Sequence, residues 1–171
     1  IDNRFYANDE NTFDRGHLVR RIDPCWGGQN VVAKAERETF RWTNCTPQHK
    51  KLNRKGGVWY QLEQHVMEHG VENKIADVNV FAGPVLGDDD LPFKKTYLGT
   101  EVKIPVVFWK VIVWSKQDGS LNAVGFMMSQ WKWVKTKLVG AKRAEAARRH
   151  LPDTYFENLK FGDHGTYQVP I

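Results

Sequence analysis

The most constraining feature of this sequence is a predicted β-hairpin in its second half. Residues 102–114 are dominated by β-branched and aromatic side chains, which predict one long strand or two short ones. Gln117-Asp118-Gly119-Ser120 is a turn signal, and Leu121–Met128 has the composition of a partner strand. Strands joined by so short a turn run antiparallel, so the fold is expected to contain an antiparallel sheet.

Helical patterns lie on both sides of this hairpin. Val58–His69 carries apolar residues at helical spacing, and Gly70 is a natural stop. Val31–Glu38 contains good helix formers, and 131–150 is expected to be helical at least in its later part. Helices and antiparallel strands in separate stretches predict an α+β fold. The 171 residues can bury a core of their own, and we expect residues 1–171 to form a single domain.

Shorter elements are predicted in the remaining segments. The predicted strands are Phe13–Arg20, Thr39–Thr43 (ended by Thr46-Pro47) and Ile75–Phe81 (ended by Gly83-Pro84). Residues 22–30 and 53–57 contain glycine and are interpreted as a loop and a turn, and the chain from residue 151 as irregular.

The chain is basic, with a net charge of +5 and an isoelectric point of about 9.2. That balance favours an anionic partner, nucleic acid first. Residues 131–150 hold seven basic residues against one glutamate, which fits either a phosphate-tracking face or a solvated helix. No apolar run approaches the roughly 18 to 20 residues of a membrane span, so we expect no membrane partner.

The two cysteines are too few for a disulfide framework. Cys25 and Cys45 lack the C-x-x-C spacing of a zinc ribbon. A zinc site built from them with His17 and His49 is conceivable, and the simpler alternatives are two free thiols or one bridge.

The polar stretch Asp14-Arg15-Gly16-His17 contains groups that phosphodiester hydrolysis requires. The reaction needs a base for water, neutralisation of the phosphate charge and stabilisation of the leaving oxygen. A histidine with a pKa of about 6.5 is a suitable base at neutral pH. Arg15 offers a rigid fork for phosphate oxygens. Each residue alone is more often structural, and only the ordered set suggests a site.

A hard metal ion would supply the other two functions. Magnesium keeps most of its waters and often takes only one or two protein oxygens, so the side-chain carbonyl of Asn53 is a sufficient anchor. A neutral ligand also leaves the ion its full charge for the phosphate.

The ordered set resembles the DNA/RNA non-specific endonuclease family, which includes sugar-non-specific bacterial nucleases and mitochondrial endonuclease G. The matching residues are the DRGH signature at 14–17, then Thr43-Asn44, Pro47-Gln48, Leu52-Asn53, Trp59 and Leu62-Glu63, then 81–85, 105–110 and 123–130. Residues 17–27 look closest to the bacterial branch often fused behind a trypsin-like peptidase domain. We therefore expect this chain to be the C-terminal part of a longer protein with such a domain upstream.

The resemblance implies roles for individual residues. His17 is implied as the general base, and Asn53 as the direct ligand of Mg²⁺, for which Mn²⁺ can substitute. Glu63 is implied to hold metal-bound water or to orient the histidine side, and Asn44 to orient the histidine. Arg15 is implied to contact substrate or support the metal shell. The implied fold is a ββα-metal (His-Me finger) core within an antiparallel sheet flanked by helices, and the implied reaction cuts DNA and RNA to 5′-phosphate ends.

Three departures from the family pattern bear on these roles. Asn53 and Glu63 are further apart than usual, and ten residues of ideal helix rotate about 1000°, onto different faces. Residues 55–57 (Lys-Gly-Gly) therefore have to break the helix if both residues serve one metal. Met67 stands where the family often has an arginine. Another family arginine lies upstream of this chain, and Arg4 or Arg41 are the candidates to replace it at the substrate.

Two other functions fit the sequence. One is a nucleic-acid-binding domain of the same fold that has lost catalysis. The other is a sequence-specific or structure-specific nuclease of the wider class. Because a cell needs protection from a non-specific nuclease, an inhibitor or regulator is expected among the partners.

Overall fold

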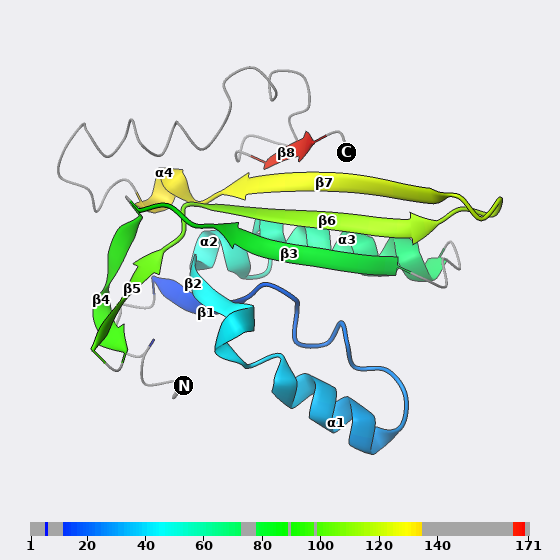
Figure 1. The fold of residues 1–171 in the computed structure, drawn as a ribbon, viewed down its shortest axis with the longest axis horizontal. Coiled ribbons are helices and arrows are strands. Elements are labelled where there is room, and N and C mark those ends of the chain that lie inside the picture. Colours follow the sequence, from blue (N-terminus) through cyan, green and yellow to red (C-terminus); the bar gives the residue numbers. More distant parts are fainter. Residues whose placement is uncertain are drawn as a thin grey trace.

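The computed structural model describes residue 6 and residues 12–72, 78–88, 90–97, 99–134 and 166–169. Its centre is an antiparallel sheet in the order β3-β6-β7-β8 (Figure 1). The strands of this sheet are β3 (Val78–Val85), β6 (Val107–Ser115), β7 (Leu121–Ser129) and β8 (Thr166–Val169). The predicted hairpin is confirmed as β6 and β7, whose turn contains Gly119 at φ +80°.

Two smaller antiparallel pairs flank the sheet. β1 (Phe13–His17) pairs with β2 (Cys45–His49), and β4 (Leu91–Tyr97) pairs with β5 (Thr100–Ile104). Residues 102–114 thus form two strands rather than one, with Pro105 between β5 and β6. The strand β4 was not predicted from the sequence.

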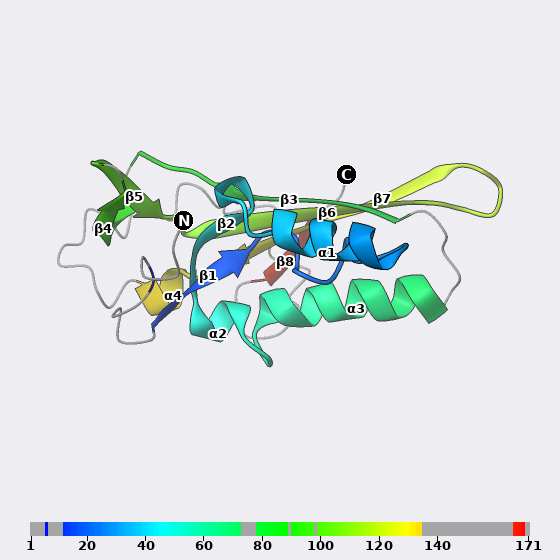
Figure 2. The same ribbon diagram turned by 90° about the horizontal axis from the view of Figure 1, so that it is seen from below.

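The helices are α1 (Gln29–Glu38), α2 (Lys50–Asn53), α3 (Val58–Glu72) and α4 (Trp131–Val134), with a 3₁₀ turn, η2 (Trp42–Asn44). Figures 1 and 2 show α2 and α3 following one another along one face of the sheet. None of the helices in the described part of the chain is long and apolar enough to cross a membrane. The predicted α+β class with an antiparallel sheet is confirmed.

The core that carries the site lies between α2, α3 and the sheet. Leu52 and Trp59 from the helices pack with Phe108 of β6 and Met128 of β7, and all four side chains are almost fully buried. Burial of such large apolar side chains contributes about 1.5–3 kcal/mol each, so this contact fixes α2 and α3 on the sheet.

Two predicted strand boundaries are wrong because proline lies inside a strand. Thr39–Thr43 is not a strand; the strand is Cys45–His49, which includes Pro47. β3 likewise continues through Gly83 and Pro84 to Val85. β2 belongs to a two-stranded pair and β3 lies at an edge of its sheet, and edge strands accept proline because they leave one row of N–H groups unpaired.

Two other predictions differ from the structure, and the predicted strand Phe13–Arg20 ends earlier, at His17. Helix α3 passes through Gly70 and ends at Glu72, since a single glycine costs a helix only about 1 kcal/mol. Residues 166–169 form β8 in the tail that was predicted to be irregular. Of the predicted helical segment 131–150, only 131–134 lies within the described residues, and it is helical.

Candidate active site

The candidate site is built on a ββα unit made of β1, β2 and α2. The register pairs His17 with Cys45 and Phe13 with His49, and α2 begins directly after β2. All five residues of β2 are buried. The unit is attached to the sheet by the buried amide of Gln130, which accepts from the His49 amide at 2.7 Å and donates to the carbonyl of Pro47.

His17 lies at the end of β1. Its imidazole packs edge-on against the Phe40 ring, with 4.7 Å between centroids, and its carbonyl accepts from the Trp59 indole at 3.1 Å. Nε2 is buried and has no hydrogen-bond partner among the residues that the structure describes. Burial lowers the pKa of His17 below its ordinary value, and the cations of Arg15 and Arg21 lower it further. A histidine in this state is neutral at neutral pH.

Arg15 and His17 lie on the same face of β1, because alternate residues of a strand share a face. The Arg15 guanidinium donates to the Phe40 carbonyl at 3.0 Å and lies 4.7 Å from the centre of that ring. Arg41, the other predicted substrate contact, is exposed and pairs with Glu38. Arg15 is therefore grouped with His17 around Phe40, whereas Arg41 is held by a surface ion pair.

Asn53 ends α2 and is attached to β1 by Asp14. Its Nδ2 donates to Asp14 Oδ2 at 3.0 Å, and Arg54 binds the same carboxylate through Nε at 3.0 Å and Nη2 at 2.7 Å. The Asn53 side-chain carbonyl has no hydrogen bond within the described residues. Asp14 thus fixes the amide so that its oxygen is the atom left for a ligand, as a hard cation requires.

The helix breaks between Asn53 and Glu63, as a metal shared by the two residues would require. Residues 54–57 separate α2 from α3, and Gly56 has φ +89°. A Cβ on Gly57 would lie 2.2 Å from the Leu52 carbonyl oxygen, so only glycine allows the chain to pass so close to α2. The two glycines therefore determine the direction of α3 relative to Asn53.

Glu63 is buried on α3 and bonds Lys110 of β6. Its Oε1 lies 2.9 Å from Lys110 Nζ, and the two side chains are 6% and 1% exposed. Lys110 Nζ also lies 4.1 Å from the centre of the Trp59 ring. Burial raises the pKa of Glu63 and lowers that of Lys110, because each charge loses water, and each is the other's compensating charge. No hydrogen bond in the described residues joins Glu63 to Asn53 or His17, and its role at the metal stays a prediction.

Asn44 holds the main chain that follows His17. Its Nδ2 donates to the carbonyls of Val19 and Thr39, and its Oδ1 accepts from the Val19 amide, each at 2.9 Å. The hydrogen-bonding groups of the Asn44 side-chain amide are therefore satisfied by backbone partners. It can position the histidine only through the backbone of the segment after it.

The donor set fits a hard ion better than zinc. Asn53 presents an amide oxygen, which suits magnesium or manganese. Among the described residues there is no group of three or more His, Cys, Asp or Glu side chains that could hold a metal, so the conceivable zinc site finds no support. Cys25 and Cys45 are both free thiols.

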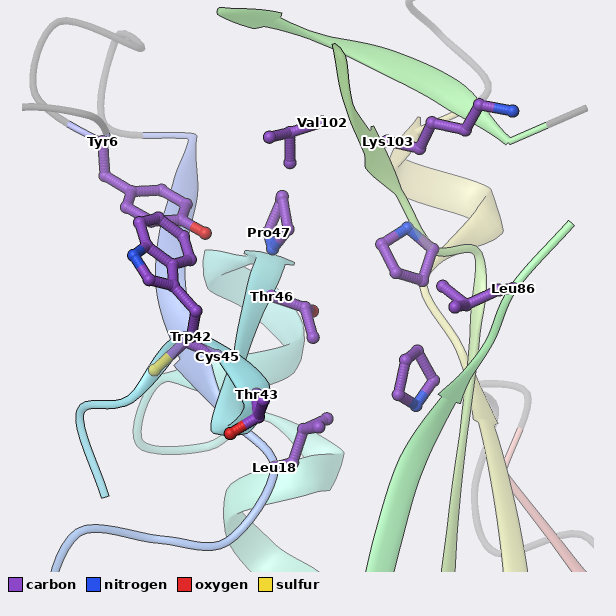
Figure 3. Close-up of a pocket in the computed structure, with 12 residues that line it drawn as sticks. Tyr6, Leu18, Trp42, Thr43, Cys45, Thr46, Pro47, Leu86, Val102 and Lys103 are labelled. Carbon is purple, nitrogen blue, oxygen red and sulfur yellow. The ribbon is translucent and has the colours of Figure 1, made fainter. Parts of the chain in front are cut away.

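A separate apolar cavity of about 450 Å³ lies between β2 and the segments around β3 and β5 (Figure 3). Trp42, Pro47 and Leu86 are among its walls, and neither His17 nor Asn53 lines it. It is therefore not part of the candidate active site.

Three residues around the site were missed by the sequence analysis: Asp14 and Arg54, which hold Asn53, and Lys110, which pairs with Glu63. Lys110 had a detectable signal, because it is the one charge inside the apolar run 104–114. A charge in a buried strand requires a partner.

Comparisons with known proteins agree on one family. A family model for DNA/RNA non-specific endonucleases matches residues 2–162. The chain is 34% identical over 167 residues to the uncharacterised protein y4fB of Sinorhizobium fredii, covering 95% of this chain and 22% of that protein. It is 33% identical over 114 residues to a salivary endonuclease of Culex quinquefasciatus, covering 65% and 27%. This chain thus spans about a quarter of the length of these relatives.

A solved structure supports the same assignment. The chain is similar to one in the crystal structure of the EndoG/EndoGI complex, with a TM-score of 0.54, 29% identity, and coverage of 75% of this chain and 51% of that one. The likeness confirms the ββα-metal nuclease fold. Since the family model also spans nearly the whole sequence, the chain belongs to the DNA/RNA non-specific endonuclease family.

Proposed function

We propose that this chain is a metal-dependent endonuclease that hydrolyses DNA and RNA without sequence preference. The observation that carries the proposal is the state of Asn53. Its amide nitrogen is bonded to Asp14 and its oxygen is left over, beside a strand that ends in His17, whose pKa is lowered by burial. A domain that only binds nucleic acid needs neither feature.

His17 is the proposed general base. Its lowered pKa keeps it neutral at neutral pH, so one ring nitrogen carries no proton and can take one from water. The water oxygen then forms a bond to phosphorus, the proton passes to His17, and the bond to the 3′ oxygen breaks, leaving an alkoxide that takes a proton from solvent. The product carries a 5′-phosphate.

Asn53 is the proposed metal ligand, with Mg²⁺ as the preferred ion and Mn²⁺ as a substitute. Bound there, the ion would neutralise phosphate charge and stabilise the leaving oxygen. Arg15 is the nearer candidate for a phosphate contact because it shares a face with His17. Arg41 would first have to leave Glu38.

Glu63 and Asn44 support the site in different ways. The pair of Glu63 and Lys110 lies beside Trp59, whose indole binds the His17 carbonyl. Asn44 fixes the backbone just after His17. Both are proposed as positioning residues.

The test incubates the chain with supercoiled plasmid and with a structured RNA, with magnesium and with excess EDTA. We expect a smear of products from both substrates, lost in EDTA, in His17→Ala and in Asn53→Ala. Asn53→Ala should regain part of its activity at high magnesium, whereas His17→Ala should not. Cleavage at the parental rate by His17→Ala would refute the base assignment.

Other outcomes separate the remaining functions. Discrete bands instead of a smear would indicate a sequence-specific or structure-specific nuclease. Salt-sensitive binding by a folded chain without turnover would indicate a domain that only binds. The single-domain organisation, the upstream peptidase-like domain and an inhibitor of this chain stay predictions.

A further inference from the structure

A second concave region lies beside α2. It is a groove of about 520 Å³ lined by Lys50 and Lys51 of α2, Lys55 in the turn after it, and Lys132 and Trp133 of α4. We call these five residues the lysine groove. Its remaining walls are residues 56–58, so no acidic side chain lines it.

The charges of the groove are directed to solvent. Lys51, Lys55 and Lys132 are exposed and Lys50 is partly buried. Within the described residues, no carboxylate pairs with Lys50, Lys51 or Lys55, whereas six other cations pair with a carboxylate or lie over an aromatic ring. Like charges gathered in one hollow repel, so an anionic ligand would stabilise the groove.

Those six cations outside the groove are Arg15, Arg20, Arg21, Arg41, Arg54 and Lys110. Their charges are already compensated or lie against an aromatic ring. The lysines of α2 and of the turn after it differ from them, because their charges remain available to a ligand. The gathering of these lysines in one hollow points to binding rather than to a structural use.

The walls of the groove are held in place. The Trp133 ring stacks on the ring of His49, with centroids 5.5 Å apart and planes within 10°, and His49 accepts from the Lys51 amide at the start of α2. Figures 1 and 2 both show α4 beside α2. The hollow is therefore formed before any ligand arrives.

The residues of the groove are close along the chain to the proposed metal ligand. Asn53 lies on the same short helix as Lys50 and Lys51, and Lys55 follows it by two residues. A strand of nucleic acid whose phosphate lay at Asn53 would pass these lysines with its neighbouring phosphates. Gly56 offers no side chain, and a Cβ there would meet nothing within 4 Å, so the backbone of a polymer can approach closely.

We propose that the lysine groove binds the sugar–phosphate backbone that flanks the scissile phosphodiester. This inference rests on the proposed function. It implies that the enzyme binds polymers through several phosphates and prefers them to short substrates. Since contacts of this kind ignore base identity, DNA and RNA duplexes should both bind there.

The test measures binding in the His17→Ala background, so that the substrate stays intact. The affinity for a fluorescein-labelled DNA duplex, and for an RNA duplex of the same sequence, is followed by anisotropy across a salt series. Lys51→Gln and Lys55→Gln are compared with Lys116→Gln, which removes the same charge from the β6–β7 turn at the other end of the sheet (Figure 1). Thermal unfolding checks that all three variants fold.

We expect each groove variant to lower the slope of log K against log salt by about 0.9 on duplex DNA, as one lost phosphate contact requires. The control should keep the parental slope. Equal slopes and affinities in groove and control variants would refute the proposal that the groove binds nucleic acid. Magnesium-dependent cleavage by the parent chain would in that case still support the proposed function. Parental cleavage by His17→Ala would refute the proposed base, and the salt series would then be run in EDTA, which keeps the substrate intact, to decide on the groove.

Discussion

Replacing Lys110 with methionine would test whether the pair beneath the site is buried as the structure has it. Methionine keeps most of the apolar stem but leaves the Glu63 carboxylate, 6% exposed, without its cation at 2.9 Å. Breaking a buried pair from one side costs about 3–5 kcal/mol. For a chain of this size, about 2–4 °C is lost per kcal/mol, so the melting temperature should fall by roughly 6 to 20 °C.

The loss of stability should depend on pH in a definite direction. Burial raises the pKa of Glu63, and Lys110 partly opposes that rise, so the variant raises the pKa further. Between the ordinary pKa of about 4.3 and this raised value, the folded state holds a proton that the unfolded state releases. Stability therefore falls as pH rises through this window. The stability that Lys110→Met loses relative to the parent is greatest above the raised pKa of Glu63. This loss shrinks as the pH falls toward the ordinary pKa.

Urea unfolding near about pH 5 and about pH 8 measures this effect. Lys116→Met, in an exposed turn, is the matched control and should change stability by less than about 0.5 kcal/mol. Adding Glu63→Gln to Lys110→Met should recover a large part of the loss. A single variant within about 0.5 kcal/mol of the parent at both pH values would show that Glu63 keeps its water and that the reasoning is wrong.

Two further predictions concern the helix break and the base. Gly57→Ala would place a Cβ 2.2 Å from the Leu52 carbonyl oxygen, so the free energy of unfolding should fall by at least about 1–3 kcal/mol. Gly28→Ala is the control, because the space around Gly28 is open, and its thermal melt should change little. The acid limb of the kcat/KM profile should have its inflection below about 6.5, because the pKa of His17 is lowered. Arg21→Gln removes one of the cations responsible, so this inflection should move to higher pH; a shift to lower pH would contradict the assignment of His17 as the titrating base.

Features encoded by local pattern were predicted well from the sequence. The β6–β7 hairpin follows from β-branched and aromatic composition and an Asp-Gly turn, and most of α3 follows from apolar spacing. A break before α3 was predicted on the condition that Asn53 and Glu63 serve one metal, and the structure has the break. These inferences need only neighbouring residues and the geometry of helices and strands.

Features that depend on distant contacts were not predicted. The strand β2 was placed too early because Pro47 is acceptable only in a strand with an unpaired edge, which the local sequence does not reveal. Lys110 lies 47 residues from Glu63, and no local rule identifies that partner. Asp14 was visible in the motif, but its hold on Asn53, 39 residues away, required the folded chain.

The attachment through Gln130 joins the ββα unit of β1, β2 and α2 to the sheet as one cooperative unit. This single side chain, fully buried, joins β2 to the segment between β5 and β6 through the His49 amide and the carbonyls of Pro47 and Pro105. Each bond that opens leaves a buried polar group unsatisfied, at about 1–3 kcal/mol. The free energy of locally opening the ββα unit thus approaches that of disrupting the sheet. Amide hydrogens of β2 should accordingly exchange with solvent at the slow rates of the central strands, and the geometry of the candidate site should persist for as long as the sheet does.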